Sequence, residues 1–223
     1  MNDDWLAVRN GRIDSNFNGI ASNASGEWYC EYGQVQFAAS GLVKSENDAF
    51  DGWYYVRNGC VQKGQETVVQ NSSGWWYIGT DGKVDFHKNT VAPNEYGWWA
   101  VRNGAVDFQL NGIASNESGD WYCRGGQVDF GAAGVLESET EGFCGWYYIQ
   151  NGCVQKGQET VKQNSNGWWY IGTDGKVDFG FSGIASNENG TWYIENGKVN
   201  FTYSGTYEDE NGRIYDIKSG NVA

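Results

Sequence analysis

Histidine, proline and methionine are almost missing from this chain of 223 residues, which has one of each. A single histidine, His87, argues against a histidine-based catalytic triad and against a multi-histidine metal site. Basic residues are also few: 15 Lys and Arg against 28 Asp and Glu give a net charge of −13. Nucleic acid and anionic membrane surfaces are disfavoured as partners, because binding them needs a basic surface. No apolar run approaches the roughly 20 residues of a membrane-spanning helix, so no membrane span is expected.

Motifs of common enzyme classes are missing as well. The chain has no nucleophile-elbow pattern and no phosphate-binding loop, and nothing places paired carboxylates such as Glu137 and Glu139 across a cleft. The first residues, Met-Asn-Asp-Asp-Trp, lack the basic start and apolar core of a signal peptide. We expect a non-catalytic protein with no cofactor and no metal site. It is either cytosolic or an excerpt of a longer exported protein.

Glycine and aromatic residues are abundant and recur in a repeat. The chain holds 33 Gly, 12 Trp, 14 Tyr and 10 Phe. An aromatic run, a turn and a Val-x-Phe sequence follow one another in residues 74–86, 97–108 and 191–201, and we count about ten such units of roughly 22 residues. A longer period lies on top, since residues 61–86 recur as 154–179 with two differences. We therefore predict a single repeat array over residues 1–223, with 93-residue super-repeats at 26–118 and 119–211 and partial units at both ends.

Each unit predicts a β-hairpin. Its first segment is aromatic and β-branched, which favours a strand. In several units an Asn-Gly pair follows, the strongest short hairpin signal, because both central residues of a type I′ turn need positive φ. In two others Asp-Gly, at residues 81–82 and 174–175, lies in a turn one residue longer. Val and Phe then alternate on a return strand, and a Gly-Ile-Ala-Ser-Asn-Glu segment links to the next unit. Since one hairpin alone is marginal in water, the units are expected to stack into an all-β solenoid of β-hairpins.

Four positions of the first strand, termed a, b, c and d, differ in how they vary from unit to unit. Position b is always aromatic and position d always apolar, as in Trp76 and Ile78. Because b and d share one face of the strand, we assign that face to the core. Position a also holds Glu27, Asp120 and Thr191, and position c is mostly Tyr. A face that accepts such polar residues is expected to be exposed to solvent.

The aromatic residues at positions a and c form the predicted binding surface. Trp and Tyr give large contact areas at low entropic cost. Aromatic faces also attract cations, which a net charge of −13 would assist. The alternative is that position a packs on the neighbouring unit and binds nothing. The predicted ligand-binding residues are Trp53, Tyr55, Trp75, Tyr77, Trp98, Trp146, Tyr148, Trp168 and Tyr170.

The pattern Gly-Trp-x-Tyr-x-x-x-Gly-x-Val recurs over nearly the whole chain. It resembles the cell-wall-binding repeats of Gram-positive bacteria, which include choline-binding repeats, glucan-binding repeats and the C-terminal repeats of large clostridial toxins. The most similar variant occurs in surface proteins of gut Firmicutes. By this resemblance, the strand residues of choline cages would be Trp75, Tyr77, Trp168 and Tyr170. Such cages also use a Trp after a Thr-Gly pair, which has no counterpart here, and often a Met, of which Met1 is the sole example.

The resemblance implies a bacterial cell-surface or secreted binding module, and so favours the exported alternative. Our first hypothesis is attachment to a glycan or other cell-wall polymer by multivalent docking on the repeated aromatic faces. The second is adhesion to a host protein such as an immunoglobulin, through the same face and the less regular loops. The third is a structural spacer that binds nothing.

Four of the five cysteines recur with the 93-residue period: Cys30 and Cys60 correspond to Cys123 and Cys153. This duplicated spacing predicts disulfides Cys30–Cys60 and Cys123–Cys153, which suit an oxidising, extracellular setting. Buried free thiols are the alternative. Cys144 has no cysteine counterpart and is either free or paired between chains.

Overall fold

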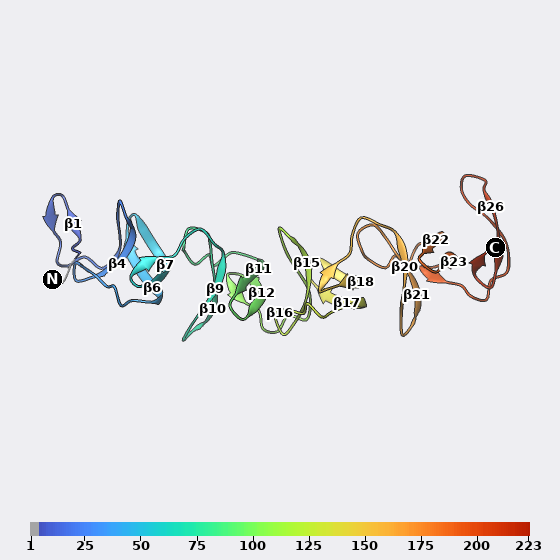
Figure 1. The fold of residues 1–223 in the computed structure, drawn as a ribbon, viewed down its shortest axis with the longest axis horizontal. Coiled ribbons are helices and arrows are strands. Elements are labelled where there is room, and N and C mark those ends of the chain that lie inside the picture. The colour runs from blue at the N-terminus through green and yellow to red at the C-terminus, as the bar shows by residue number, and fades with distance from the viewer. Residues whose placement is uncertain (1–4) are drawn as a thin grey trace. The chain divides into compact units, whose positions relative to one another are not determined.

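The structure is a computed structural model that describes residues 5–223, a range that contains strands but no helix. Met1, the sole methionine, lies outside the described residues. The chain divides into two compact units, with the boundary between Phe108 and Gln109. Within each unit antiparallel hairpins follow one another along the chain, in the colour order of Figure 1. The predicted class, an all-β solenoid of stacked β-hairpins, is confirmed. Because the described range has no helix, no helical membrane span occurs there.

The strands are short and evenly distributed between the two units. The first unit contains β1 (Val8–Arg9), β2 (Arg12–Ile13), β3 (Gly19–Asn23), β4 (Gly26–Glu31), β5 (Gln34–Val35), β6 (Gly41–Asn47), β7 (Phe50–Arg57), β8 (Cys60–Val61), β9 (Thr67–Asn71), β10 (Gly74–Ile78), β11 (Thr90–Asn94), β12 (Gly97–Arg102) and β13 (Ala105–Val106). The second contains β14 (Gly112–Asn116), β15 (Gly119–Arg124), β16 (Gln127–Val128), β17 (Gly134–Thr140), β18 (Phe143–Gln150), β19 (Cys153–Val154), β20 (Thr160–Asn164), β21 (Gly167–Ile171), β22 (Gly183–Asn187), β23 (Gly190–Glu195), β24 (Lys198–Val199), β25 (Gly205–Glu208), β26 (Ile214–Lys218) and β27 (Asn221–Val222).

The repeating element is a long hairpin followed by a short return strand. In the β22–β23 hairpin, Ile184 pairs with Tyr193. After the Asn-Gly turn, β24 pairs back with β23 through Val199 and Ile194. The Gly-Ile-Ala-Ser-Asn segment is therefore a strand, and the prediction that it is a link is wrong. Its small and polar residues carry no strand signal of their own, so its pairing depends on the aromatic strand beside it.

The Asn-Gly turns have the predicted geometry. Asn196 and Gly197 both have positive φ, at 49° and 76°, as a type I′ turn requires. Glycine is needed there for a second reason: a Cβ on Gly197 would lie 2.4 Å from the carbonyl oxygen of Asp178, in the preceding repeat. The Gly197 amide also donates to the carbonyl oxygen of Phe181 at 2.7 Å. The turn of each repeat thus rests directly on the backbone before it.

The return strand also pairs with the preceding hairpin. Lys198 in β24 pairs both with its own hairpin and with Trp169, at position b of the hairpin before. The amide of Tyr170 donates to the carbonyl oxygen of Gly197 at 2.8 Å. The backbone ladder therefore continues from one hairpin into the next. The side chain after the turn fills the space left by the glycine before position a, since a Cβ on Gly167 would lie 2.3 Å from Lys198 Cε.

Both faces of an aromatic strand are covered by neighbouring repeats. Tyr77 and half-buried Trp75, at positions c and a of β10, pack against Trp99 and Val101, at positions b and d of β12. The a–c face of one hairpin thus contacts the b–d face of the next. Position d is the centre of this core, as predicted. Its members are all at most 4% exposed: Cys30, Val56, Ile78, Val101, Cys123, Ile149, Ile171 and Ile194.

The predicted disulfides are not formed, and the alternative of free thiols holds for all five cysteines. Cys60 lies opposite Trp28, so it is diagonal to Cys30. Diagonal partners in an antiparallel pair have Cα atoms about 7–8 Å apart, beyond the usual limit of about 6.8 Å for a disulfide. The Cys60 sulfur lies 3.4 Å from where a Cβ on Gly26 would be, on the side away from Cys30. The second pair has the same register, with Cys153 opposite Trp121.

Candidate functional site

The predicted binding residues share one face of the aromatic strands, but that face is not open to solvent. Tyr77 and Tyr170 are only 3% and 5% exposed. Burial, together with the neighbouring Glu159 carboxylate, raises the pKa of Tyr170 to about 12. The prediction of an exposed a–c face is therefore wrong, because the next hairpin covers it. The remaining predicted residues are half-buried: Trp53, Tyr55, Trp75, Trp98, Trp146, Tyr148 and Trp168.

Aromatic residues of consecutive repeats meet in triads. A triad combines the Trp at position a of one repeat, the Trp at position b of the next, and the Phe that ends the return segment of that next repeat. Sequence reasoning missed the Phe, because the return strand was expected to continue through it. The strand instead ends at the preceding Val, and the Phe lies at the edge of the stack. These side chains are about half exposed: Phe37, Phe86, Phe108, Phe130, Phe179 and Phe201.

The Trp at position b is held in place by its own hairpin turn. The indole nitrogen of Trp169 donates to Asn164 Oδ1 at 2.9 Å, and that oxygen also accepts the backbone amide of Asn166 at 2.9 Å. The same bond joins Trp76 to Asn71 at 3.1 Å. The orientation of the ring is thus fixed before any ligand arrives, which lowers the entropic cost of binding on its face.

Among the triads that lie within one unit of residues 5–223, three are closed, with their rings in direct contact. In one of them the Trp75 and Trp99 ring centroids lie 4.9 Å apart, and Phe108 lies 5.7 Å from Trp75. Edge-to-face or tilted contacts at such distances leave no space between rings. These triads hold the repeats together and offer no cavity. They are Trp5/Trp28/Phe37, Trp75/Trp99/Phe108 and Trp168/Trp192/Phe201.

Two further triads of the described residues are open, and a cavity lies among the rings of each. They are equivalent under the 93-residue period and each lies within one unit. The first cage, of about 130 Å³, is lined by Leu42, Trp53, Asn71, Ser73, Trp76, Val84 and Phe86. The second cage, of about 230 Å³, is lined by Val135, Trp146, Asn164, Asn166, Trp169, Val177, Phe179 and Lys198.

The chemistry of the first cage suits a small cation that carries methyl groups. Trp53, Trp76 and Phe86 present aromatic surface, Leu42 and Val84 add apolar surface, and no carboxylate lines the cavity. A cation can bind over an aromatic face by cation–π attraction, and methyl groups on it tolerate apolar walls. The volume of about 130 Å³ corresponds to roughly four water-sized groups. That space matches a trimethylammonium-sized group.

An ion pair replaces the triad at two other interfaces. Glu27 stands at position a where other repeats have Trp, and it pairs with Lys63, which stands in the place of the Phe. Asp120 and Lys156 repeat this exchange 93 residues later. The polar residues that seemed to indicate an exposed position a are therefore explained by a paired substitution. Within each 93-residue super-repeat, which we call a block, an ionic interface is followed by an open triad and then by a closed one.

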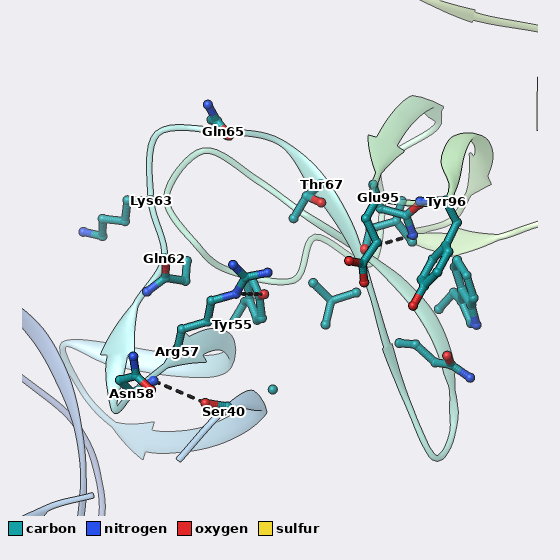
Figure 2. Close-up of a pocket in the computed structure, with 16 residues that line it drawn as sticks. Ser40, Tyr55, Arg57, Asn58, Gln62, Lys63, Gln65, Thr67, Glu95 and Tyr96 are labelled. Atoms are coloured by element: carbon teal, nitrogen blue, oxygen red, sulfur yellow. Dashed lines mark hydrogen bonds between the residues drawn. The ribbon is translucent and has the colours of Figure 1, made fainter. Parts of the chain in front are cut away.

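A second hollow in the first unit is larger and more polar. It has a volume of about 640 Å³ and is bordered by side-chain amides, by Tyr55, Trp75 and Tyr96, and by Arg57. Figure 2 shows Gln62, Lys63 and Gln65 on one side of this hollow and Thr67, Glu95 and Tyr96 on the other. Tyr96 is 65% exposed and its ring lies 6.0 Å from that of Trp75. We call this feature the polar groove.

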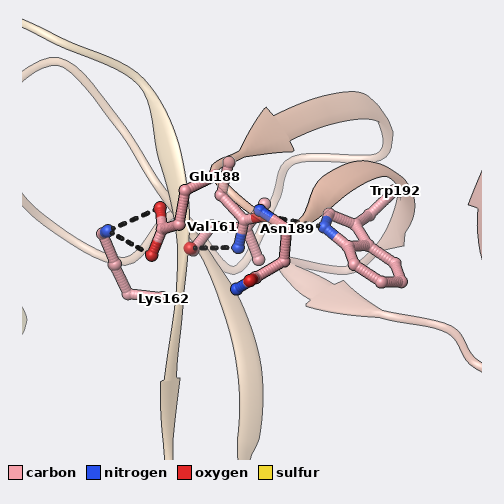
Figure 3. Close-up of polar contacts among 6 residues, drawn as sticks. Val161, Lys162, Glu188, Asn189 and Trp192 are labelled. Atoms are coloured by element: carbon pink, nitrogen blue, oxygen red, sulfur yellow. Dashed lines mark hydrogen bonds and ion pairs between the residues drawn. The ribbon is translucent and has the colours of Figure 1, made fainter.

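In the second block, two of the residues equivalent to those of the polar groove form an ion pair. Lys162 replaces Val69, and its ammonium pairs with both carboxylate oxygens of Glu188 at 3.1 and 3.2 Å, as Figure 3 shows. In the first block the corresponding residues, Val69 and Glu95, both line the polar groove. The two blocks thus differ at the polar groove by an ion pair that one has and the other lacks.

Stacked hairpins with aromatic cages between consecutive repeats define this protein as a hairpin-repeat solenoid. A sequence profile of the choline-binding repeat matches residues 16–36, 40–62, 66–85, 88–107, 111–129, 145–155 and 180–200, more than half of the chain. The chain belongs to the choline-binding repeat family. No curated protein matches it in sequence.

Several solved structures are similar in fold. Choline binding protein F from Streptococcus pneumoniae is 17% identical over 89% of this chain and 70% of that chain, with a TM-score of 0.37. CbpJ from the same organism is 14% identical over 100% of this chain and 92% of that chain, with a TM-score of 0.28. An alternansucrase in complex with isomaltotriose is 14% identical over 91% of this chain but only 17% of that chain, with a TM-score of 0.37.

Proposed function

We propose that this chain is a non-catalytic module that attaches to a cell-wall polymer by taking a quaternary ammonium group, such as choline, into an open aromatic cage. Membership of the choline-binding repeat family supports this function. The observation that carries it is the first cage, where three aromatic side chains and two aliphatic ones surround a cavity of the right size for such a group. The single continuous array over residues 1–223 and an extracellular, cell-surface location are part of the proposal.

Electrostatics favour the same ligand. The net charge of −13 attracts cations to the protein surface, while no carboxylate lines the cage itself. Selectivity for a methylated cation over a small metal ion then comes from the aromatic faces, because these cannot replace the oxygen ligands that hard cations need.

Titration with choline chloride, followed by tryptophan fluorescence and calorimetry, tests this proposal. We expect saturable binding by the wild-type protein and a loss of at least tenfold in affinity for Trp53→Ala, because this substitution removes one wall of the first cage. The neutral isostere 3,3-dimethylbutanol should bind roughly 2- to 30-fold more weakly than choline, since it lacks the cation–π term of about 0.5–2 kcal/mol.

Tyr32→Ala provides the matched control. Tyr32 is 77% exposed and lines neither cage, so its removal should leave the choline titration unchanged. Equal binding of choline and its neutral isostere, or wild-type affinity in Trp53→Ala, would contradict the proposed cation site.

Glycan binding is the second candidate function, and the polar groove is the observation that favours it. Side-chain amides such as Gln62, Gln65 and Asn94 can hydrogen-bond to sugar hydroxyls, and Trp75 and Tyr96 offer aromatic faces for a sugar ring. The volume of about 640 Å³ is within the usual range for ligand sites.

Val69→Lys should close the polar groove, because it copies the second block, where Lys162 pairs with Glu188. On an array of neutral oligosaccharides we expect retention to fall at least tenfold relative to wild type, while the exposed-site variant Tyr32→Ala keeps wild-type retention. Undiminished retention by Val69→Lys would rule out the polar groove as the glycan site.

Host-protein adhesion, including immunoglobulin binding, and a pure spacer role remain hypotheses without a specific feature of residues 5–223 in their favour. Capture of a serum protein that persists with excess choline and sugar would support adhesion. Absence of detectable binding in every assay would support the spacer role.

A further inference from the structure

The two open cages are built from equivalent residues, yet two positions next to the Trp at position b change in charge. The lining pairs are mostly identical or similar, such as Trp76 and Trp169 or Phe86 and Phe179. On one side the Trp at position b pairs with Val69 at the first cage and with Lys162 at the second, where the Lys162 ammonium is neutralised by Glu188. On the other side it pairs with Ala105 at the first cage and with Lys198 at the second. A duplicated site therefore has a neutral and a cationic version within one chain.

The Lys198 side chain runs beside Gly167 and reaches the second cage. Its side chain passes that glycine closely, as a Cβ there would lie 2.3 Å from Cε and 3.0 Å from Nζ. Its ammonium lies 5.0 Å from the centroid of the Trp169 ring, within the range of a cation–π contact. Lys198 also lines the cavity. Within residues 5–223, no carboxylate lies within ion-pair distance of its ammonium to neutralise the charge.

At the first cage no lysine side chain fills the corresponding space, beside Gly74. The closest atoms to a Cβ on Gly74, the counterpart of Gly167, belong to the Trp76 indole at 3.7 Å or more. Ala105 pairs opposite Trp76 and is too short to cover the ring. The Trp76 ring therefore has no built-in cation to compete with a ligand.

We propose that Lys198 is a specificity-determining residue that closes the second cage to cationic ligands, so that the chain takes one quaternary ammonium group, in the first cage. This inference rests on the proposed function. The Lys198 ammonium already uses the aromatic surface of Trp169, and a second cation there would meet a like charge. Two unit charges about 5 Å apart repel enough to weaken binding roughly 4- to 300-fold, for effective dielectric constants between about 80 and 20.

Reciprocal substitution at the two equivalent positions tests the inference. With choline as the probe and calorimetry as the readout, wild type should bind one equivalent per chain, and Lys198→Ala should gain a second. Lys198→Gln keeps most of the side-chain length without the charge and should also gain the second site, whereas Lys198→Arg should not. Ala105→Lys should place a cation over Trp76 and remove the first site.

The outcomes separate this inference from the proposed function. Two equivalents bound by wild type, or one equivalent bound by Lys198→Ala with unchanged affinity, would overturn the role of Lys198 and leave the choline-binding proposal standing. No binding by wild type, Lys198→Ala or Lys198→Gln would overturn both. Tryptophan near-ultraviolet circular dichroism and the thermal midpoint of each variant check that the stack is intact. If Ala105→Lys fails to fold, the three Lys198 variants still test whether Lys198 closes the second cage.

Discussion

Gly197→Ala is expected to destabilise the second unit by about 2–4 kcal/mol, as strained backbone and a direct clash act together. Gly197 has a φ of +76°, which an alanine adopts at a cost of about 1 kcal/mol. The added Cβ would also lie 2.4 Å from the Asp178 carbonyl oxygen and 2.7 Å from Phe179 Cα. Because both atoms belong to the preceding repeat, that repeat and the turn must move apart. Urea unfolding followed by circular dichroism measures the loss.

Gly142→Ala separates the two contributions. Gly142 lies in the same unit with a φ of +82°, but nothing lies within 4 Å of a Cβ added there. Its substitution should therefore cost only the conformational term of about 1 kcal/mol. Equal losses in the two variants would show that the repeat-to-repeat contact at Gly197 contributes nothing.

Ile149→Ala is expected to lower the free energy of unfolding by about 2–5 kcal/mol. Ile149 occupies position d of β18, is fully buried, and packs in one cluster with Ile113, Tyr147 and Val154. In a stack of this kind each repeat contacts only its neighbours, so the cavity cannot be filled from elsewhere in the core. The urea midpoint should fall by roughly 1 M or more.

The control for this substitution is Ile214→Ala in the same unit. Ile214 is 65% exposed, so its truncation should change stability by no more than about 0.5 kcal/mol. A small effect of Ile149→Ala would indicate that position d is not the centre of the core.

Much of this fold could be predicted from local sequence signals. The Asn-Gly pairs specify their turns through their own backbone preferences, and Asn58, Asn103, Asn151 and Asn196 all have positive φ as expected. Position d is invariably apolar because each copy lies in the same buried place. These properties recur in several units, so the chain itself supplies the comparison that an alignment would otherwise give.

The site was less predictable, because it depends on contacts between repeats. Variation at position a suggested solvent exposure, but Glu27 is accommodated there only because Lys63 changes with it, 36 residues later. The strand built from Gly-Ile-Ala-Ser-Asn has no hydrophobic alternation of its own to reveal it. Whether a triad is open or closed depends on where whole hairpins lie, as the closed Trp75 triad and the open Trp53 cage show. Residue identity alone does not distinguish them.

The fixed order of ionic and aromatic interfaces within 93 residues bears on how such a chain can grow. Copying one repeat adds an interface whose type depends on where the copy is inserted, whereas copying a whole block adds one complete cage with its neighbours already matched. Under the proposed function, each added block would therefore supply one further cage, either open or closed to a cation. The residue after the turn, Ala as at position 105 or Lys as at position 198, would decide whether the new cage admits a cationic ligand.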